Sequence, residues 1–282
     1  MRKIKIFTDS TSDLTPKLLE RYQIGVVPLY VVFGEASYRD GVDMVPGTLY
    51  RLVDETGGLP KTSAPSPGDF LAHFESFLND GYDIVYIGLS SELSSTIQNA
   101  KIVASQFEEG RVTVIDSLNL CTGIGLQAVQ AARMAEEGKT PHEIEDFLLR
   151  KRGDIESEFI IDTLDYLHKG GRCSSVQAFI GNMLKIRPVV KVVNGKMIVA
   201  AKIRGKREKA LNQLLDNALE NVDKIIPGSI YVAHSFSLEE AQYLRDELTR
   251  RTGDPDISIT EAGCVISSHC GPQTVGVFYM KA

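Results

Sequence analysis

The apolar run DIVYI, Asp83 to Ile87, is followed directly by GLSSELSSTIQNA, Gly88 to Ala100. The first part predicts a short buried strand, and the last part has the character of a helix. The turn between them is rich in hydroxyl groups: Ser90, Ser91, Ser94, Ser95 and Thr96. A strand that opens into such a turn and a helix N-terminus gathers O–H and N–H donors, which suits an anionic group. The alternative is that one of these serines only caps the helix.

Strands and helices alternate on both sides of this stretch, which predicts a parallel α/β sheet in the first half of the chain. We expect strands at residues 4–7, within 24–33 and at 111–115, and a long helix from about 122 to 137. Ligands of such sheets bind beyond the carboxyl ends of the strands. Those ends carry Asp9 and Asp116, and Thr62 is expected in a loop that reaches the same edge. Either aspartate could hold Mg²⁺, but capping of a helix is the favoured interpretation.

The helical pattern breaks near residues 152–154, and this break predicts two domains, 1–155 and 156–282. The second half contains an apolar strand near 159–161 and two β-rich runs joined by Asn194-Gly195, a strong hairpin signal. Amphipathic helices follow. The fold class predicted is therefore α/β, with an N-terminal parallel-sheet domain and a C-terminal α/β domain that has a mixed sheet.

Composition narrows the range of functions. The chain has 282 residues and a formal net charge of −6, without a broad basic stripe, which argues against a nucleic-acid partner. It has no apolar run long enough for a transmembrane segment, and it begins without the apolar core of a signal peptide, so a cytoplasmic location is expected. Cys264 and Cys270 flank His269, but four zinc ligands are not completed, and we expect no metal site.

The common cofactor and hydrolase motifs are missing from the sequence. It contains no G-x-x-x-x-G-K-[ST] loop, no G-x-G-x-x-G after a strand and no G-x-S-x-G. We therefore expect no cofactor. Binding of an anionic ligand without chemistry becomes the simpler hypothesis.

Six short motifs, in order along almost the whole chain, resemble those of the DegV family. They are Thr8 to Leu14, Lys61 to Pro67, Ser90 to Thr96, Gly170-Gly171-Arg172 with Ser174, Arg187-Pro188, and His269 to Pro272. The resemblance implies a two-domain α/β protein that binds a long-chain fatty acid between its domains and is not itself an enzyme. It also implies a partner, a separate fatty-acid kinase that makes acyl-phosphate for phospholipid synthesis. Transient membrane contact is compatible with this role.

The resemblance assigns roles to individual residues. Thr62 and Ser94 match the positions whose hydroxyls meet the fatty-acid carboxylate, and Arg172 and His269 match the polar network around it. Ser95 is included in the predicted site, although the family more often has glycine there. Arg204 lies roughly where the family contacts the kinase. Cys270 and Gln273 depart from the family's usual His-Thr-Gly-Pro-Gly, which leaves the shape of the head-group site open.

Two other functions remain open at this stage. In one, the chain is a serine esterase or acyl hydrolase, with Ser94 as nucleophile and His269 as base. In the other, it binds a small polyol or sugar phosphate in a polar pocket. Turnover of a p-nitrophenyl ester that disappears in Ser94→Ala would favour the esterase, and a short ligand in a polar pocket, instead of an apolar tunnel, would favour the polyol or sugar-phosphate binder.

Overall fold

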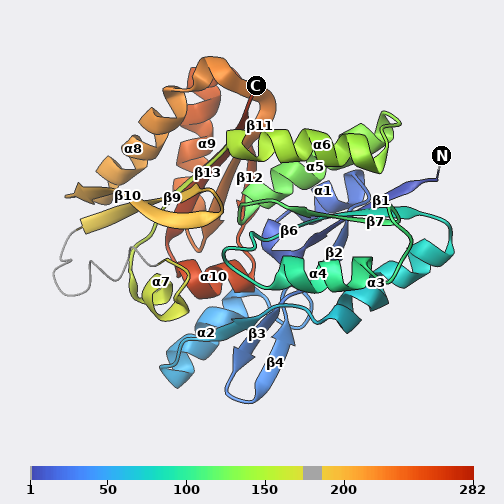
Figure 1. Cartoon of the computed structure of the whole chain (residues 1–282). Coiled ribbons are helices and arrows are strands. Elements are labelled where there is room, and N and C mark those ends of the chain that lie inside the picture. Colours follow the sequence, from blue (N-terminus) through green and yellow to red (C-terminus); the bar gives the residue numbers. More distant parts are fainter. Residues whose placement is uncertain (1, 174–185) are drawn as a thin grey trace.

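The computed structural model describes residues 2–173 and 186–282 and has the predicted α/β architecture (Figure 1). Ser174, part of one family motif, lies outside the described residues. Two larger sheets stand side by side, and a small third sheet lies beside them with helix α2 (Pro46–Thr56). No helix in the described ranges is both long and apolar enough to cross a membrane.

The first sheet is parallel throughout, as predicted, with the order β2-β1-β6-β7. Its strands are β1 (Ile4–Asp9), β2 (Gly25–Val27), β6 (Asp83–Gly88) and β7 (Val112–Asp116). One face is covered by α3 (Pro67–Asn79) and α4 (Thr96–Ala104), whose apolar side chains form a separate core with β1 and β6. The long helix α5 (Thr122–Glu136) and α6 (Pro141–Lys151) also pack against this sheet. Helix α1 (Pro16–Arg21) has Thr15 as its N-cap and Pro16 in its first turn, and the Thr15 hydroxyl accepts from Leu18 N.

A small antiparallel sheet, with the order β4-β3-β5, corrects two expectations. Residues 24–33 hold two strands instead of one, β2 and β3 (Tyr30–Phe33), because Pro28 lies between them and cannot donate a ladder hydrogen bond. Thr62 is on strand β5 (Lys61–Ser63), paired with Val31, and not in a loop. The third strand is β4 (Ala36–Arg39).

The second large sheet is mixed, as predicted, with the order β10-β9-β8-β13-β11-β12 and one parallel pair, β11 with β12. Its strands are β8 (Ile155–Ile160), β9 (Ile186–Val193), β10 (Lys196–Arg204), β11 (Ile225–Ser235), β12 (Ser258–Glu261) and β13 (Thr274–Lys281). Helices α8 (Arg207–Leu219) and α9 (Leu238–Thr252) cover one face. The predicted Asn194-Gly195 hairpin is confirmed: both residues have positive φ, 49° and 81°.

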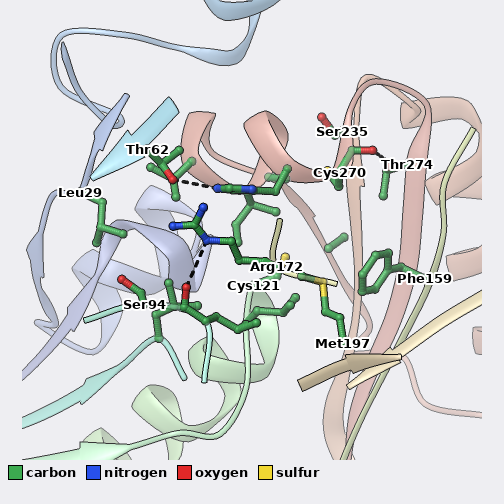
Figure 2. Close-up of a pocket in the computed structure, with 18 of the residues that line it drawn as sticks. Leu29, Thr62, Ser94, Cys121, Phe159, Arg172, Met197, Ser235, Cys270 and Thr274 are labelled. Atoms are coloured by element: carbon green, nitrogen blue, oxygen red, sulfur yellow. Dashed lines mark hydrogen bonds between the residues drawn. The ribbon is translucent and has the colours of Figure 1, made fainter. Parts of the chain in front are cut away.

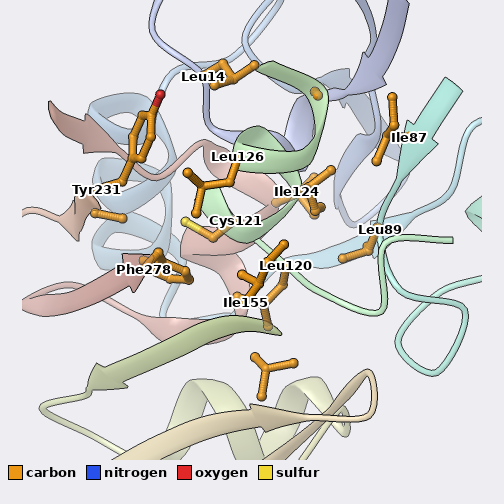
Figure 3. Packing of buried hydrophobic residues seen from close by; sticks show 14 of the residues in the cluster. Leu14, Ile87, Leu89, Leu120, Cys121, Ile124, Leu126, Ile155, Tyr231 and Phe278 are labelled. Carbon is orange, nitrogen blue, oxygen red and sulfur yellow. The ribbon is translucent and has the colours of Figure 1, made fainter. Parts of the chain in front are cut away.

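Helix α5 joins the two large sheets into one core. It packs on β1 and β6 of the parallel sheet and on β8, β11 and β13 of the mixed sheet. The cluster around it combines side chains from both halves of the chain, for example Ile87, Ile124 and Phe278 (Figure 3). Gly125 allows this close packing, because a Cβ there would lie 2.9 Å from the Ser12 carbonyl oxygen. The domain boundary at residue 155 stays a prediction.

Two short helices complete the interior between the sheets, α7 (Asp165–Gly170) and α10 (Cys264–Cys270). They contact each other, and α10 also contacts α2, β3 and β5. Among the residues that the structure describes, 3₁₀ turns also lie at Ser10–Ser12, Arg152–Asp154 and Val222–Lys224. Through these contacts, α10 brings His269 next to the small sheet that carries Thr62.

Candidate functional site

A cavity of about 280 Å³ lies between the two large sheets. Most of its wall is apolar, formed from both halves of the chain (Figure 2). The apolar lining includes Leu29, Leu89, Leu93, Leu120, Phe159, Leu167, Met197, Val265, Ile266 and Phe278. Its volume is close to the lower limit of about 300 Å³ that is common for small-molecule sites. The lining suits an apolar ligand with a polar end.

The polar end is formed by residues that the sequence singled out. Thr62, Ser94, Ser95, Arg172 and His269 all line this cavity. Four chain segments supply them: strand β5, the turn before α4, the turn after α7, and helix α10. Figure 2 shows Thr62, Ser94 and Arg172 on the same side of the cavity. The structure therefore brings the predicted site residues together, while their role toward a ligand stays a prediction.

Ser94 points its hydroxyl to a neighbouring hydroxyl. Its Oγ lies 2.8 Å from Thr96 Oγ1 and accepts a hydrogen bond from Thr96 N at 3.3 Å. Ser95, which occupies the N-cap position of α4, makes no side-chain capping bond and is exposed at the cavity. Both serine hydroxyls therefore stand where the helix N-terminus favours negative charge.

His269 is paired with Thr62, whose Oγ1 lies 2.8 Å from His269 Nε2. Burial, with the positive charge of Arg172 nearby, lowers the pKa of His269 to about 4, so the ring is neutral at pH 7. Within the described part of the chain, its Nδ1 is buried without a hydrogen-bond partner. Gly170 lies against this atom: a Cβ on Gly170 would be 2.4 Å from Nδ1. The esterase hypothesis needs a Ser94–His269 pair, and the structure gives each residue a different partner.

Arg172 supplies the positive charge of the polar end. Its Nη1 donates to Gly170 O at 2.7 Å and its Nε to Leu93 O at 3.4 Å. The side chain is exposed, and it links the turn after α7 to the serine turn before α4. A guanidinium held by two carbonyls keeps further N–H donors for an anion.

Two buried carboxylates, to which the sequence assigned no role, hold helix α10 in place. Asp40 accepts hydrogen bonds from Cys264 N at 2.7 Å and Val265 N at 3.3 Å, and Asp13 accepts from Gly263 N at 2.8 Å. Burial raises the pKa of both carboxyl groups. More than 200 residues separate each of them from its partner in α10. No local sequence pattern signals so distant a cap.

The two strand-end aspartates have structural partners. Asp9 caps the turn at Ser10–Ser12 and also accepts from Tyr86 OH at 2.8 Å and Leu89 N at 2.9 Å, in agreement with the capping interpretation. Asp116 accepts from Ser91 Oγ at 2.6 Å. Across the residues that the structure describes, no group of three or more His, Cys, Asp or Glu side chains could hold a metal ion.

The departures from the family pattern lie at or near this site. Cys270 lines the cavity, and Gln273 is exposed with a φ of 55° while its carbonyl oxygen accepts from Arg207.

Arg204, the residue predicted to contact a kinase, lies outside the set of cavity-lining residues and is exposed at the end of β10. Within the described ranges it makes no ion pair, whereas its neighbour Arg207 binds Glu240 and Asp162.

The fold and the cavity define a class: an α/β protein with two large sheets, a largely apolar cavity between them, and a polar end of that cavity built by both halves of the chain. Residues 3–282 match the family model described as uncharacterised protein of the DegV family, and the chain belongs to this family. The predicted family membership is thereby confirmed.

Relatives with names that state a ligand are similar over nearly their whole length. A protein of Thermotoga maritima named fatty acid-binding protein is 34% identical, with 97% of this chain and 96% of the relative covered. A fatty-acid-binding DegV family protein of Thermus thermophilus is 33% identical, with a TM-score of 0.90 and complete coverage of both chains. A stearic acid-binding protein of Eubacterium ventriosum is 29% identical, with a TM-score of 0.88, covering 100% of this chain and 98% of that one.

Proposed function

We propose that this protein binds a long-chain fatty acid in the cavity between its two sheets and presents the carboxylate to a separate kinase. The observation that carries the proposal is the cavity itself, apolar along most of its wall and polar at the end formed by Thr62, Ser94, Arg172 and His269. The names of the similar DegV proteins support the same ligand class. In this proposal residues 1–155 and 156–282 act as the two halves that enclose the ligand.

The acyl chain supplies most of the affinity. Burial of about 16 carbons, at roughly 0.8 kcal/mol for each methylene, gains on the order of 11 kcal/mol before the costs of binding. The carboxylate contributes differently: without partners it would cost several kcal/mol to bury. Donors at the polar end remove this cost and fix which end of the ligand is held there.

Neutral His269 determines what Thr62 can donate. When Nε2 carries the ring proton, it donates to Thr62 Oγ1, and the hydroxyl hydrogen of Thr62 is left for the carboxylate. The other tautomer would use up that hydrogen and would bury an unpaired Nδ1–H. The hydroxyls of Ser94 and Ser95 and the guanidinium of Arg172 complete the set of donors. Hydroxyl donors hold the carboxylate without a tight ion pair, which suits a ligand that is passed to an enzyme.

Presentation to a kinase needs a surface outside the cavity, and Arg204 is the residue we propose for it. Its charge is exposed at the end of β10, and β10 also contributes Met197 to the cavity. A side chain that contacts only the partner should affect transfer and leave fatty-acid affinity unchanged.

The proposal is tested by ligand identity and by two sets of variants. Protein purified from cells without detergent should carry a fatty acid that lipid mass spectrometry identifies. Ser94→Ala and Thr62→Val should weaken binding of stearate, each by about tenfold to a hundredfold, since a hydrogen bond to a charged group contributes about 1.5–3 kcal/mol. Arg204→Glu should keep stearate affinity and lower acyl-phosphate formation with the kinase. Protein that neither carries nor takes up a fatty acid would refute the proposal.

A further inference from the structure

We propose that the cavity has a second polar element that accepts a hydroxyl group on the acyl chain, so that hydroxylated fatty acids belong to its ligands. The element is the pair of hydroxyls of Ser235 and Thr274, called here the Ser235–Thr274 wall. The inference rests on the proposed function and adds a ligand class to it.

The wall lies apart from the carboxylate end. Ser235 and Thr274 are directly opposite each other on strands β11 and β13, and both line the cavity. Figure 2 shows them on the side away from Thr62 and Ser94. Ser235 has no exposed surface and Thr274 is 7% exposed, so neither hydroxyl faces bulk water. The strand positions next along the same face, Ala233 and Gly276, are apolar or without a side chain.

The hydrogen bonds of the wall leave it with acceptors and without donors. Ser267 Oγ donates to Ala262 O at 3.1 Å, so its single hydrogen is used. The 2.8 Å contact between Ser235 Oγ and Ser267 Oγ must then use the hydrogen of Ser235. The 2.6 Å contact between Tyr50 OH and Ser235 Oγ must in turn use the hydrogen of Tyr50. Thr274 Oγ1 donates to Cys270 O at 3.0 Å.

His234 lines the same cavity, but strand alternation puts its side chain on the other face of the sheet. It pairs with Glu261 of β12 and with Val275, a residue of the core beneath α8 and α9. The thiol of Cys270 donates to Gly271 O at 3.5 Å, and its sulfur adds at most a weak acceptor. The lone pairs of Ser235 and Thr274 are thus the strong polar groups offered here.

Two consequences follow for the ligand. A carboxylate has only acceptor atoms, so the wall disfavours it and reinforces the orientation in which the carboxylate lies at Thr62 and Ser94. A hydroxyl on the acyl chain can donate to the wall, whereas a carbonyl at the same carbon cannot. The wall therefore selects a hydroxy acid over the corresponding oxo acid.

The test compares stearate with 3-, 10-, 12- and 16-hydroxystearate and with the oxostearates of the same positions, by competition binding to the full chain. At the position that reaches the wall, the hydroxy acid should bind about tenfold more tightly than its oxo partner, a difference of about 1.4 kcal/mol. The Ser235→Ala/Thr274→Val double variant should remove this preference. Ser157→Ala is the control, because Ser157 is a buried serine of the same sheet outside the cavity lining among the described residues.

A second variant gives the Ser235–Thr274 wall a hydrogen-bond donor, and it still tests the inference if the double variant does not fold. Ser267→Ala removes the acceptor of the Ser235 hydrogen, which frees one hydrogen of the Tyr50–Ser235 pair. It should therefore improve binding of the oxo acid and narrow the preference. Equal binding of hydroxy and oxo acids at every position in the wild type, or a preference that survives in the double variant, would overturn the inference. Failure of stearate itself to bind would instead refute the proposed function.

Discussion

At the scale of single residues, the contact between Gly170 and His269 decides the geometry of the polar end. The first atom of a larger side chain at Gly170 would lie 2.4 Å from His269 Nδ1 and 3.2 Å from Cε1. Since real Cβ contacts are not this short, the imidazole would have to move, and its bond to Thr62 would be strained or lost.

Gly170→Ala should consequently weaken stearate binding by about tenfold, the effect of losing roughly one hydrogen bond, while the thermal midpoint changes little. Isothermal titration and thermal unfolding measure the two quantities. Gly153→Ala is a matched control, because no described heavy atom lies within 4 Å of the position of its Cβ. Wild-type affinity in Gly170→Ala would show that the contact does not position His269.

The lowered pKa of His269 also predicts how the stability of the protein depends on pH. Its pKa is about 4 in the folded protein, against 6.5 for an unperturbed histidine, because burial and Arg172 disfavour the charged ring. Between these two values the unfolded chain binds more protons than the folded one, so stability falls as the pH falls from about 6.5 to about 4. The loss attributable to this residue is on the order of 3 kcal/mol.

Other groups titrate in the same range, so the measurement is a difference between two proteins. Unfolding free energies of the wild type and His269→Gln are compared at several pH values by urea denaturation. The variant should lose less stability than the wild type between pH 6.5 and 4. Parallel pH profiles for the two proteins would contradict a buried neutral imidazole.

The sequence predicted this part of the site through its motifs. Thr62, Ser94, Ser95, Arg172 and His269 lie around one cavity although they are far apart along the chain. The supporting roles behind them were not predicted: Asp13 and Gly170 lie within the quoted motifs without an assigned role, and Asp40 lies outside them. All three act through contacts with distant segments. Such contacts depend on tertiary packing, and no spacing along the sequence encodes them.

At the scale of secondary structure, helix α10 is too short to be stable alone and depends on its N-terminal partners. Asp40 satisfies two of its first N–H groups at the positive end of the helix. Asp40→Ala leaves these buried donors without a partner, so it should cost about 2–3 kcal/mol of stability and weaken stearate binding through His269. Denaturant unfolding and titration with stearate test both effects.

Asp43→Ala is the control for Asp40, from the same loop. Asp43 is exposed and pairs with Arg39 at the surface, where ion pairs contribute little, so its removal should leave both measurements nearly unchanged. Equal effects of the two substitutions would mean that the α10 cap has no special role.

The elements themselves were predicted unevenly, for physical reasons. Long periodic helices and the Asn194-Gly195 hairpin follow from local patterns, and the structure confirms them. Strand β5 was missed because three residues, Lys61–Ser63, carry no periodic signal and become a strand only by pairing with β3. Short strands of this kind are determined by their partners more than by their own sequence.

At the scale of the whole molecule, the core decides how the two halves unfold. Helix α5 buries 11 of its 15 residues, and the main core cluster contains side chains from both sheets. In the proposed function, the parts of the chain before and after residue 155 enclose the ligand from two sides. Because they share one core, however, we expect that they do not unfold independently. The chain should show one calorimetric transition, with equal calorimetric and van't Hoff enthalpies.

Two substitutions far from α5 test this cooperativity. Phe74 is fully buried in the cluster under α3 and α4, and Leu214 is buried beneath α8 on the outer face of the mixed sheet. Phe74→Ala and Leu214→Ala should each cost about 2–5 kcal/mol. If the protein is a single cooperative unit, each substitution lowers the midpoint of the one transition. If the halves were independent, the transition would split in two, and only the mutated half would unfold at a lower temperature. Because the cavity is built from both halves, a single transition would also mean that saturating stearate raises the midpoint of either variant without separating it into two steps.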